Sequence, residues 1–180
     1  MLTVILILAM RISPVDATPV LTANQISQSQ DKDQDQEPRF NVRRTHQLKD
    51  LQKEEIKLGP KLEHKLKIWV MDTELKRQEG MMFLELQDVS EKQGMIFVFR
   101  REYPLSFWMM NTLIALDIAY LDEDGVIVKI YTMKPLDTVT DYGSGKYAKY
   151  ALEVRAGLFK KLKVEVGQKI EIPDTVKAKG

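Results

Sequence analysis

Apolar and polar residues alternate along much of the chain after residue 55, with the period of two that is typical of β-strands. Three stretches carry the pattern most clearly: Leu66–Val70, Leu116–Tyr120 and Ala148–Val154. A fourth stretch, Gly94–Phe99, has five apolar residues in a row after its glycine and the length of a fully buried strand. Short strands at close intervals predict an α+β domain, with a mainly antiparallel sheet or a small, partly closed barrel and two short helices.

Turn residues between these stretches predict how the strands are joined. Gly59-Pro60 follows the apolar positions Ile56 and Leu58 and predicts a hairpin with the first alternating stretch. Asp122–Gly125 follows the second stretch and predicts another hairpin, which continues into a strand at residues 126–130.

Helix signals are weaker and fall in two places. Asp72 is expected to cap a short helix through Thr73 and Leu75 that ends at Gly80. A second short helix is expected at residues 156–162, and a last strand at residues 169–172.

The first 54 residues have a different pattern. Residues 3–10 form an apolar run shorter than the ~20 residues that span a bilayer, and Val15-Asp16-Ala17 then places a small residue at a cleavage position. We therefore expect a signal peptide at residues 1–17 and a periplasmic or secreted protein, with membrane contact only through an uncleaved N-terminal segment. Residues 18–54 read as a disordered, charged linker, residues 55–173 as the globular domain and residues 174–180 as a flexible tail.

Composition removes several kinds of chemistry. The formal net charge is +1 and the basic residues are scattered, which disfavours nucleic-acid binding. The chain has no cysteine, so disulfides and thiolate metal sites are excluded. Its two histidines, His46 and His64, lie outside the clearest strands, so neither a Ser-His-Asp centre nor a histidine-rich metal site is expected. We expect no cofactor and no metal.

Several segments carry a family resemblance. They are GMMF at 80–83, GMIFVF at 94–99, FWMMNTLIALDI at 107–118, YGS at 142–144 and YALEVRAG at 150–157. In order and spacing they resemble the domain of unknown function 192 family, and the resemblance extends over residues 65–172. It implies a compact, mostly antiparallel β domain that commonly follows an export signal, and it implies no activity. Met110 and Ala115 stand where the family usually has a basic residue and a proline.

The candidate ligand-binding residues lie within or beside these segments. They are Trp108, Asn111, Asp117, Ser144 and Glu153. Asp117 has apolar neighbours on its strand, so it is either a general acid or base paired with Glu153, or an acceptor for backbone N–H groups of the turn at 111–113. Trp108 beside Asn111 forms either a stacking platform for a ligand or part of the core.

These observations favour a non-catalytic ligand-binding or accessory domain of the cell envelope, with a small molecule or an envelope polymer as its ligand. The alternative is a carboxylate-based hydrolase or lyase that acts on an envelope or extracellular polymer. The sequence leaves catalysis, the ligand and the oligomeric state open.

Overall fold

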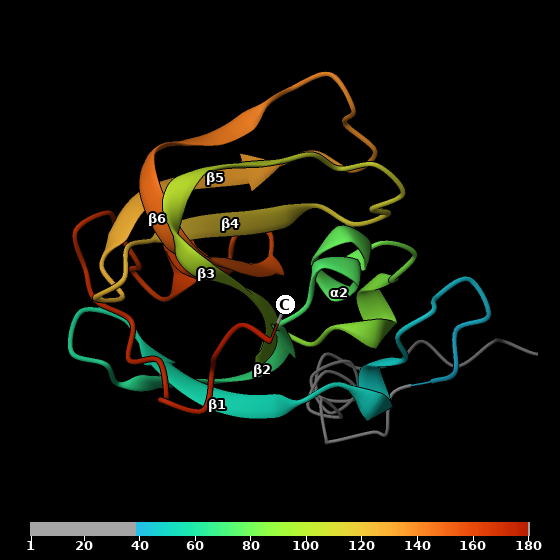
Figure 1. Ribbon diagram of the computed structural model, residues 1–180, viewed down its shortest axis with the longest axis horizontal. Helices are drawn as coiled ribbons and strands as arrows, with labels where there is room; N and C mark the ends of the chain where they lie inside the picture. The colour runs from blue at the N-terminus through green and yellow to red at the C-terminus, as the bar shows by residue number, and fades with distance from the viewer. Residues whose placement is uncertain (1–38, 180) are drawn as a thin grey trace, which may run out of the picture. The chain divides into compact units, whose positions relative to one another are not determined.

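The computed structural model describes residues 39–179 of the chain. These residues form a single six-stranded sheet with short helices on both sides (Figure 1). The strands are β1 (Lys53–Leu58), β2 (His64–Met71), β3 (Gln93–Phe107), β4 (Leu116–Leu121), β5 (Ile127–Met133) and β6 (Tyr142–Arg155). The α-helices are α2 (Glu74–Glu79) and α3 (Leu158–Lys161), and the 3-10 helices are η1 (Leu48–Asp50) and η2 (Leu86–Asp88). None of the helices within residues 39–179 is long and apolar enough to cross a membrane.

The strand order is β1-β2-β3-β6-β4-β5, and every neighbouring pair is antiparallel except β2 and β3. Figure 1 shows β3 and β6 between the β1–β2 hairpin and the β4–β5 hairpin. The predicted α+β class and both predicted hairpins are confirmed, and the sheet is open. β3 and β6 are longer than their apolar stretches and stay paired past an irregularity between Val98 and Tyr103.

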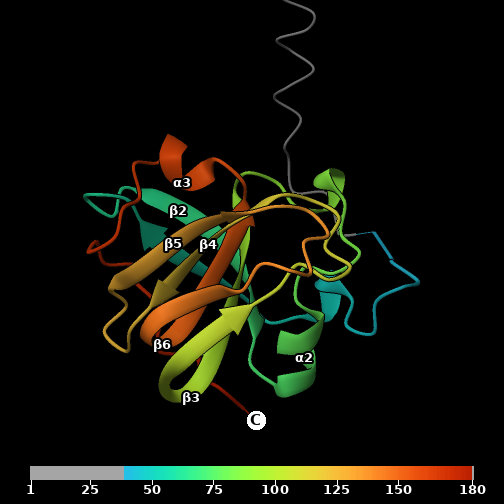
Figure 2. The same ribbon diagram turned by 90° about the horizontal axis from the view of Figure 1, so that it is seen from above.

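The two faces of the sheet carry separate hydrophobic cores because side chains alternate along each strand. One face, here called the α2 face, buries residues such as Met95, Phe97, Ile118, Tyr120 and Ala151 together with the segment after α2. The other, the α3 face, buries residues such as Ile96, Val98, Ala119, Leu152 and Val154 together with α3. Figure 2 shows α2 and α3 on opposite sides of the sheet.

The folded body begins earlier than the predicted start at residue 55. Leu48 and Leu51 are buried in the core of the α2 face, and the Arg44 side chain is buried beside them in the chain. Residues 44–54 therefore pack on the body, because the two buried leucines, and an arginine that donates hydrogen bonds to backbone carbonyls, offset the charged composition that suggested a linker. The predicted signal peptide and the first part of the predicted linker lie outside the described residues, so export stays a prediction.

The C-terminal segment also differs from its prediction. Residues 169–172 form no strand and make only isolated bridges, at Lys169 and Glu171. The predicted flexible tail packs on the body, since Val176 is buried and Lys179 forms an ion pair with Asp72.

The N-cap of α2 is one residue later than predicted. Thr73 caps the helix by accepting a hydrogen bond from the Lys76 backbone N–H, and Gly80 ends it as expected. The Asp72 carboxylate is fully buried and instead binds the ammonium groups of Lys76 and Lys179, at 2.7 and 2.6 Å. Two cations hold this carboxylate more strongly than a helix N-terminus would, which explains why the cap passes to the neighbouring threonine.

Candidate functional site

A pocket of about 480 Å³ lies on the α2 face, between α2, the segment that follows it and β3. Residues of α2 form one wall of this pocket, and Figure 2 shows this helix beside β3. The opposite wall is rich in aromatic rings: Phe97, Phe99, Tyr103, Phe107 and Trp108. The sequence predicted Gly94–Phe99 only as a buried strand. Side chains alternate between the two faces of this strand, so Phe97 and Phe99 both point toward the pocket.

The polar group inside this aromatic wall is the carboxyl of Glu153. Glu153 lies on β6, opposite Met95 of β3 and Ile118 of β4, and its exposed fraction is 4%. Within residues 39–179 its carboxyl has no hydrogen-bond or ion-pair partner. Burial away from water raises the pKa of Glu153 to about 8, so its carboxyl is mainly protonated at neutral pH.

The aromatic wall is packed in fixed orientations. The rings of Phe97 and Phe107 meet edge to face with centroids 4.9 Å apart, and Phe107 meets Tyr120 in the same way at 5.8 Å. The guanidinium of Arg77 lies 5.0 Å from the centre of the Phe99 ring and donates a hydrogen bond to the Val98 carbonyl. Such edge-to-face contacts stabilise the arrangement of the rings in this wall.

The loop after α2 depends on unusual backbone angles. Gly80 has φ 45°, and a Cβ at this position would come within 3.0 Å of the Phe97 ring, so glycine lets the ring approach the backbone. Phe83 and Asn111 also have positive φ, 63° and 58°, and the Phe83 N–H donates to the Asn111 carbonyl at 2.8 Å. This hydrogen bond connects the loop after α2 to the turn at Asn111. Asparagine adopts a positive φ more readily than most other residues.

Arg44 fixes the same loop from the other side. One guanidinium nitrogen donates to the carbonyls of Gly80 and Met82, at 2.8 and 2.6 Å, and the other lies 3.6 Å from the Glu79 carboxylate. Burial opposes ionisation of Glu79, but hydrogen bonds from the backbone of His46 and its neighbour, with the charge of Arg44, hold its pKa below the usual range. This clamp was missed from the sequence because the charged segment around Arg44 was assigned to a linker.

The structure separates the predicted site residues. Trp108 and Glu153 both line the pocket, and Trp108 is 54% exposed. Asn111 does not line the pocket, but its side-chain nitrogen lies 4.0 Å from the sulfur of Met82, which does. Ser144 is buried elsewhere, where its hydroxyl accepts from the Leu105 N–H and donates to a nearby carbonyl.

Asp117 lies on the α3 face and does not meet Glu153. Its carboxylate accepts hydrogen bonds from the backbone N–H groups of Gly157 and Phe159, at 2.8 and 3.2 Å, and from the Thr132 hydroxyl at 2.7 Å. Asp117 therefore organises the turn that follows β6, whereas the sequence reading gave it the turn at Asn111 or a catalytic partnership with Glu153.

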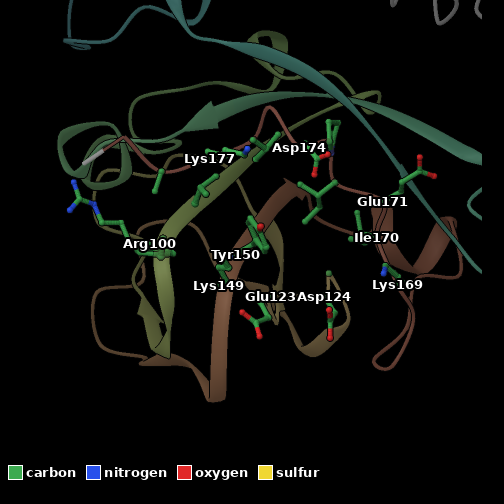
Figure 3. A pocket seen from close by; sticks show the side chains of 17 residues that line it. Arg100, Glu123, Asp124, Lys149, Tyr150, Lys169, Ile170, Glu171, Asp174 and Lys177 are labelled. Carbon is green, nitrogen blue, oxygen red and sulfur yellow. The ribbon is translucent and has the colours of Figure 1, made fainter.

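Two further hollows lie near the sheet. One of about 410 Å³ shares Ser106, Phe107 and Trp108 with the pocket and extends to residues 138–141. Another, of about 670 Å³, lies between β3, β6 and the C-terminal segment (Figure 3). Its lining includes charged side chains of both signs, such as Arg100 and Glu123, that are exposed to water, and none of its ionisable side chains is buried as that of Glu153 is.

The fold and this pocket define a small α+β protein with an open sheet and one aromatic-walled site. The sequence profile of the DUF192 family, described as uncharacterized ACR, matches residues 56–172, and the chain belongs to this family. A UPF0127 protein of Pyrococcus abyssi is 31% identical over 105 residues, which are 58% of this chain and 85% of that protein.

Two crystal structures are similar to this fold. A Sinorhizobium meliloti protein, described as a candidate transcription regulator, is 27% identical with a TM-score of 0.63, over 67% of this chain and 94% of its own. A Novosphingobium aromaticivorans protein of unknown function is 28% identical with a TM-score of 0.64, over 71% of this chain and 90% of its own.

Proposed function

We propose that this protein is a binding protein for a small molecule, and that its site is the pocket on the α2 face. The apolar part of the ligand packs against the aromatic wall, and its polar part meets the carboxyl of Glu153. One observation carries the proposal: a carboxyl that is 4% exposed, without a partner in residues 39–179, lines a pocket of about 480 Å³. Buried polar groups are almost always hydrogen-bonded, and the exceptions concentrate at functional sites.

Two features favour binding over hydrolysis. Polymer hydrolysis by carboxylates requires two such groups that face each other across a cleft, roughly 5 to 10 Å apart. The pair expected for that reaction, Asp117 with Glu153, is not formed, because the two side chains lie on opposite faces of the sheet. The carboxylate of Glu79, which also lines the pocket, is already held by Arg44 and backbone N–H groups.

Small neutral probes test the proposal on the full chain. We expect benzyl alcohol, cyclohexanol and N-methylpyrrolidone to bind with dissociation constants on the order of 1 mM, as fits ligands of this size. Two-dimensional NMR should locate the largest shifts at the backbone amides of Gly80, Phe97 and Trp108.

A blocking variant supplies the control. Met82→Trp fills the pocket from its rim and should abolish these shifts, while Leu86→Trp adds the same ring at a position that is 56% exposed and outside the pocket, and should preserve them. Shifts that are absent from the pocket of the unchanged protein, or that persist in Met82→Trp, would disprove the proposed site.

A further inference from the structure

Among residues 39–179, no cationic side chain forms an ion pair with the carboxyl of Glu153. Within residues 39–179, Arg77 is the only basic residue that lines the pocket, and its guanidinium lies over Phe99 and binds the Val98 carbonyl. A buried carboxylate is strongly unfavourable unless a cation or several donors meet it. The described part of the chain therefore supplies no partner for the ionised form of this group.

Acidic groups outnumber basic ones around the pocket. Three carboxyl groups line it, those of Glu74, Glu79 and Glu153, against the single guanidinium of Arg77. Arg44 does not line the pocket and forms an ion pair with Glu79, so it does not neutralise the carboxylate of Glu153. Tyr103 also lines the pocket, and burial raises the pKa of its hydroxyl, so it stays neutral over the ordinary pH range. Tyr120 packs in the core behind the pocket, its hydroxyl donates to the Tyr142 carbonyl, and burial raises its pKa as well.

The aromatic rings that line the pocket also favour a cation. The faces of aromatic rings carry partial negative charge and attract ammonium groups, with Trp the strongest of the side chains. Phe97, Phe99, Phe107 and the half-exposed Trp108 surround the same space as the Glu153 carboxyl. A neutral polar group would use the carboxyl but gain little from the rings.

We infer that the polar part of the ligand is an organic cation of the ammonium type, held between the Glu153 carboxylate and the aromatic wall. This inference rests on the proposed function and adds the charge and chemical class of the ligand. The cation supplies the missing counter-ion and gains from the rings at the same time.

The pH dependence of ligand binding provides a distinct test, because binding of a cation is coupled to proton release from Glu153. An ammonium group stabilises the ionised carboxyl, so its binding releases a proton from Glu153 below the pKa of about 8. Affinity should therefore rise about tenfold per pH unit between pH 6 and 8 and level off above. A neutral ligand that accepts a hydrogen bond from the protonated acid would bind with nearly constant affinity below pH 8 and would lose affinity above it.

Choline and 3,3-dimethylbutan-1-ol form a matched pair of probes, because they have the same shape and differ by one atom and one charge. The charge of choline does not change with pH, so any pH dependence arises in the protein. Calorimetric titration of the full chain at pH 6, 7, 8 and 9 should show choline binding on the order of tenfold more tightly than its neutral isostere at pH 8.

Two variants separate the contribution of Glu153 from general charge effects. Glu153→Gln should remove the preference for choline and its pH dependence, while the isostere binds as before. Glu165→Gln removes an exposed carboxylate that does not line the pocket and should change the affinity for choline by less than about threefold, because solvent screens that charge.

The possible results distinguish this inference from the proposed function. If the isostere binds as tightly as choline, if the affinity for choline falls as pH rises, or if only the neutral probes bind, the ligand is not a cation but the pocket still binds. If neither these two compounds nor the neutral probes bind, both the inference and the proposed function are wrong.

Discussion

Two buried carboxyl groups stand on neighbouring strands of this sheet and have opposite surroundings. Asp117 of β4 is 2% exposed and accepts three hydrogen bonds, whereas Glu153 of β6 is 4% exposed and has no partner within residues 39–179. Burial alone therefore does not indicate a function. The difference lies in the number of donors that the fold brings to each group.

The two carboxyl groups differ in their donors because different elements cover the two faces of the sheet. Over Asp117, the chain leaves β6 and turns at Gly157, with φ 86°, so that two backbone N–H groups point at the carboxylate. Over Glu153, the neighbouring elements present the rings of Phe97 and Phe107, which have no donors to offer. The first arrangement stabilises the fold, and the second leaves a group for a ligand to bind.

The largest effect should come from Glu153→Gln. Below pH 4.5 the carboxyl is protonated in both the folded and the unfolded state and has no effect. Between pH 4.5 and about 8 the unfolded state ionises while the folded state keeps its proton, so the stability of the unchanged protein falls as pH rises. We expect Glu153→Gln to be more stable by on the order of 3 kcal/mol at pH 7, and equal at pH 4.

Urea unfolding of both proteins at pH 4, 5.5, 7 and 8 measures this difference. A gain that is the same at every pH would mean that the effect of the substitution is unrelated to ionisation. A loss of stability at pH 7 would mean that Glu153 has a partner in the folded state, and the contrast with Asp117 would disappear.

The next effect should come from Asp117→Asn, in the opposite direction. The amide keeps one acceptor for the N–H groups of Gly157 and Phe159, but the hydrogen bonds lose their charge assistance. We expect a loss of about 1 to 3 kcal/mol in urea unfolding at neutral pH. A neutral or stabilised variant would place Asp117 with Glu153 among the functional groups.

The smallest effect should come from Thr132→Val, which removes one of the three donors to Asp117 and keeps the shape of the side chain. Two backbone donors remain, so we expect a loss of about 1 kcal/mol. In the double variant with Asp117→Asn the two losses should not add, because both substitutions act on one hydrogen-bonded group. Additive losses would show that Thr132 acts independently of Asp117.

Local pattern was sufficient for much of the fold. Period-two alternation located the strands, and turn residues such as Gly59-Pro60 and Asp122–Gly125 located both hairpins, because these signals act between residues close in sequence. The segments around Phe107–Ile118 also identified the family. The apolar neighbours of Asp117 indicated a buried carboxylate, and its exposed fraction is 2%, but they left its structural and catalytic roles open.

The pairing of β4 with β6 decided which candidate residues come together in a site. These two strands have β5 between them in the chain. Asp117 pairs with Val154, and Glu153 pairs with Ile118, so the two carboxyl groups fall on opposite faces. A shift of one residue in this register would place them on the same face. No local signal sets that register, so the sequence alone could name both residues as candidates but could not separate the structural one from the one that lines the pocket.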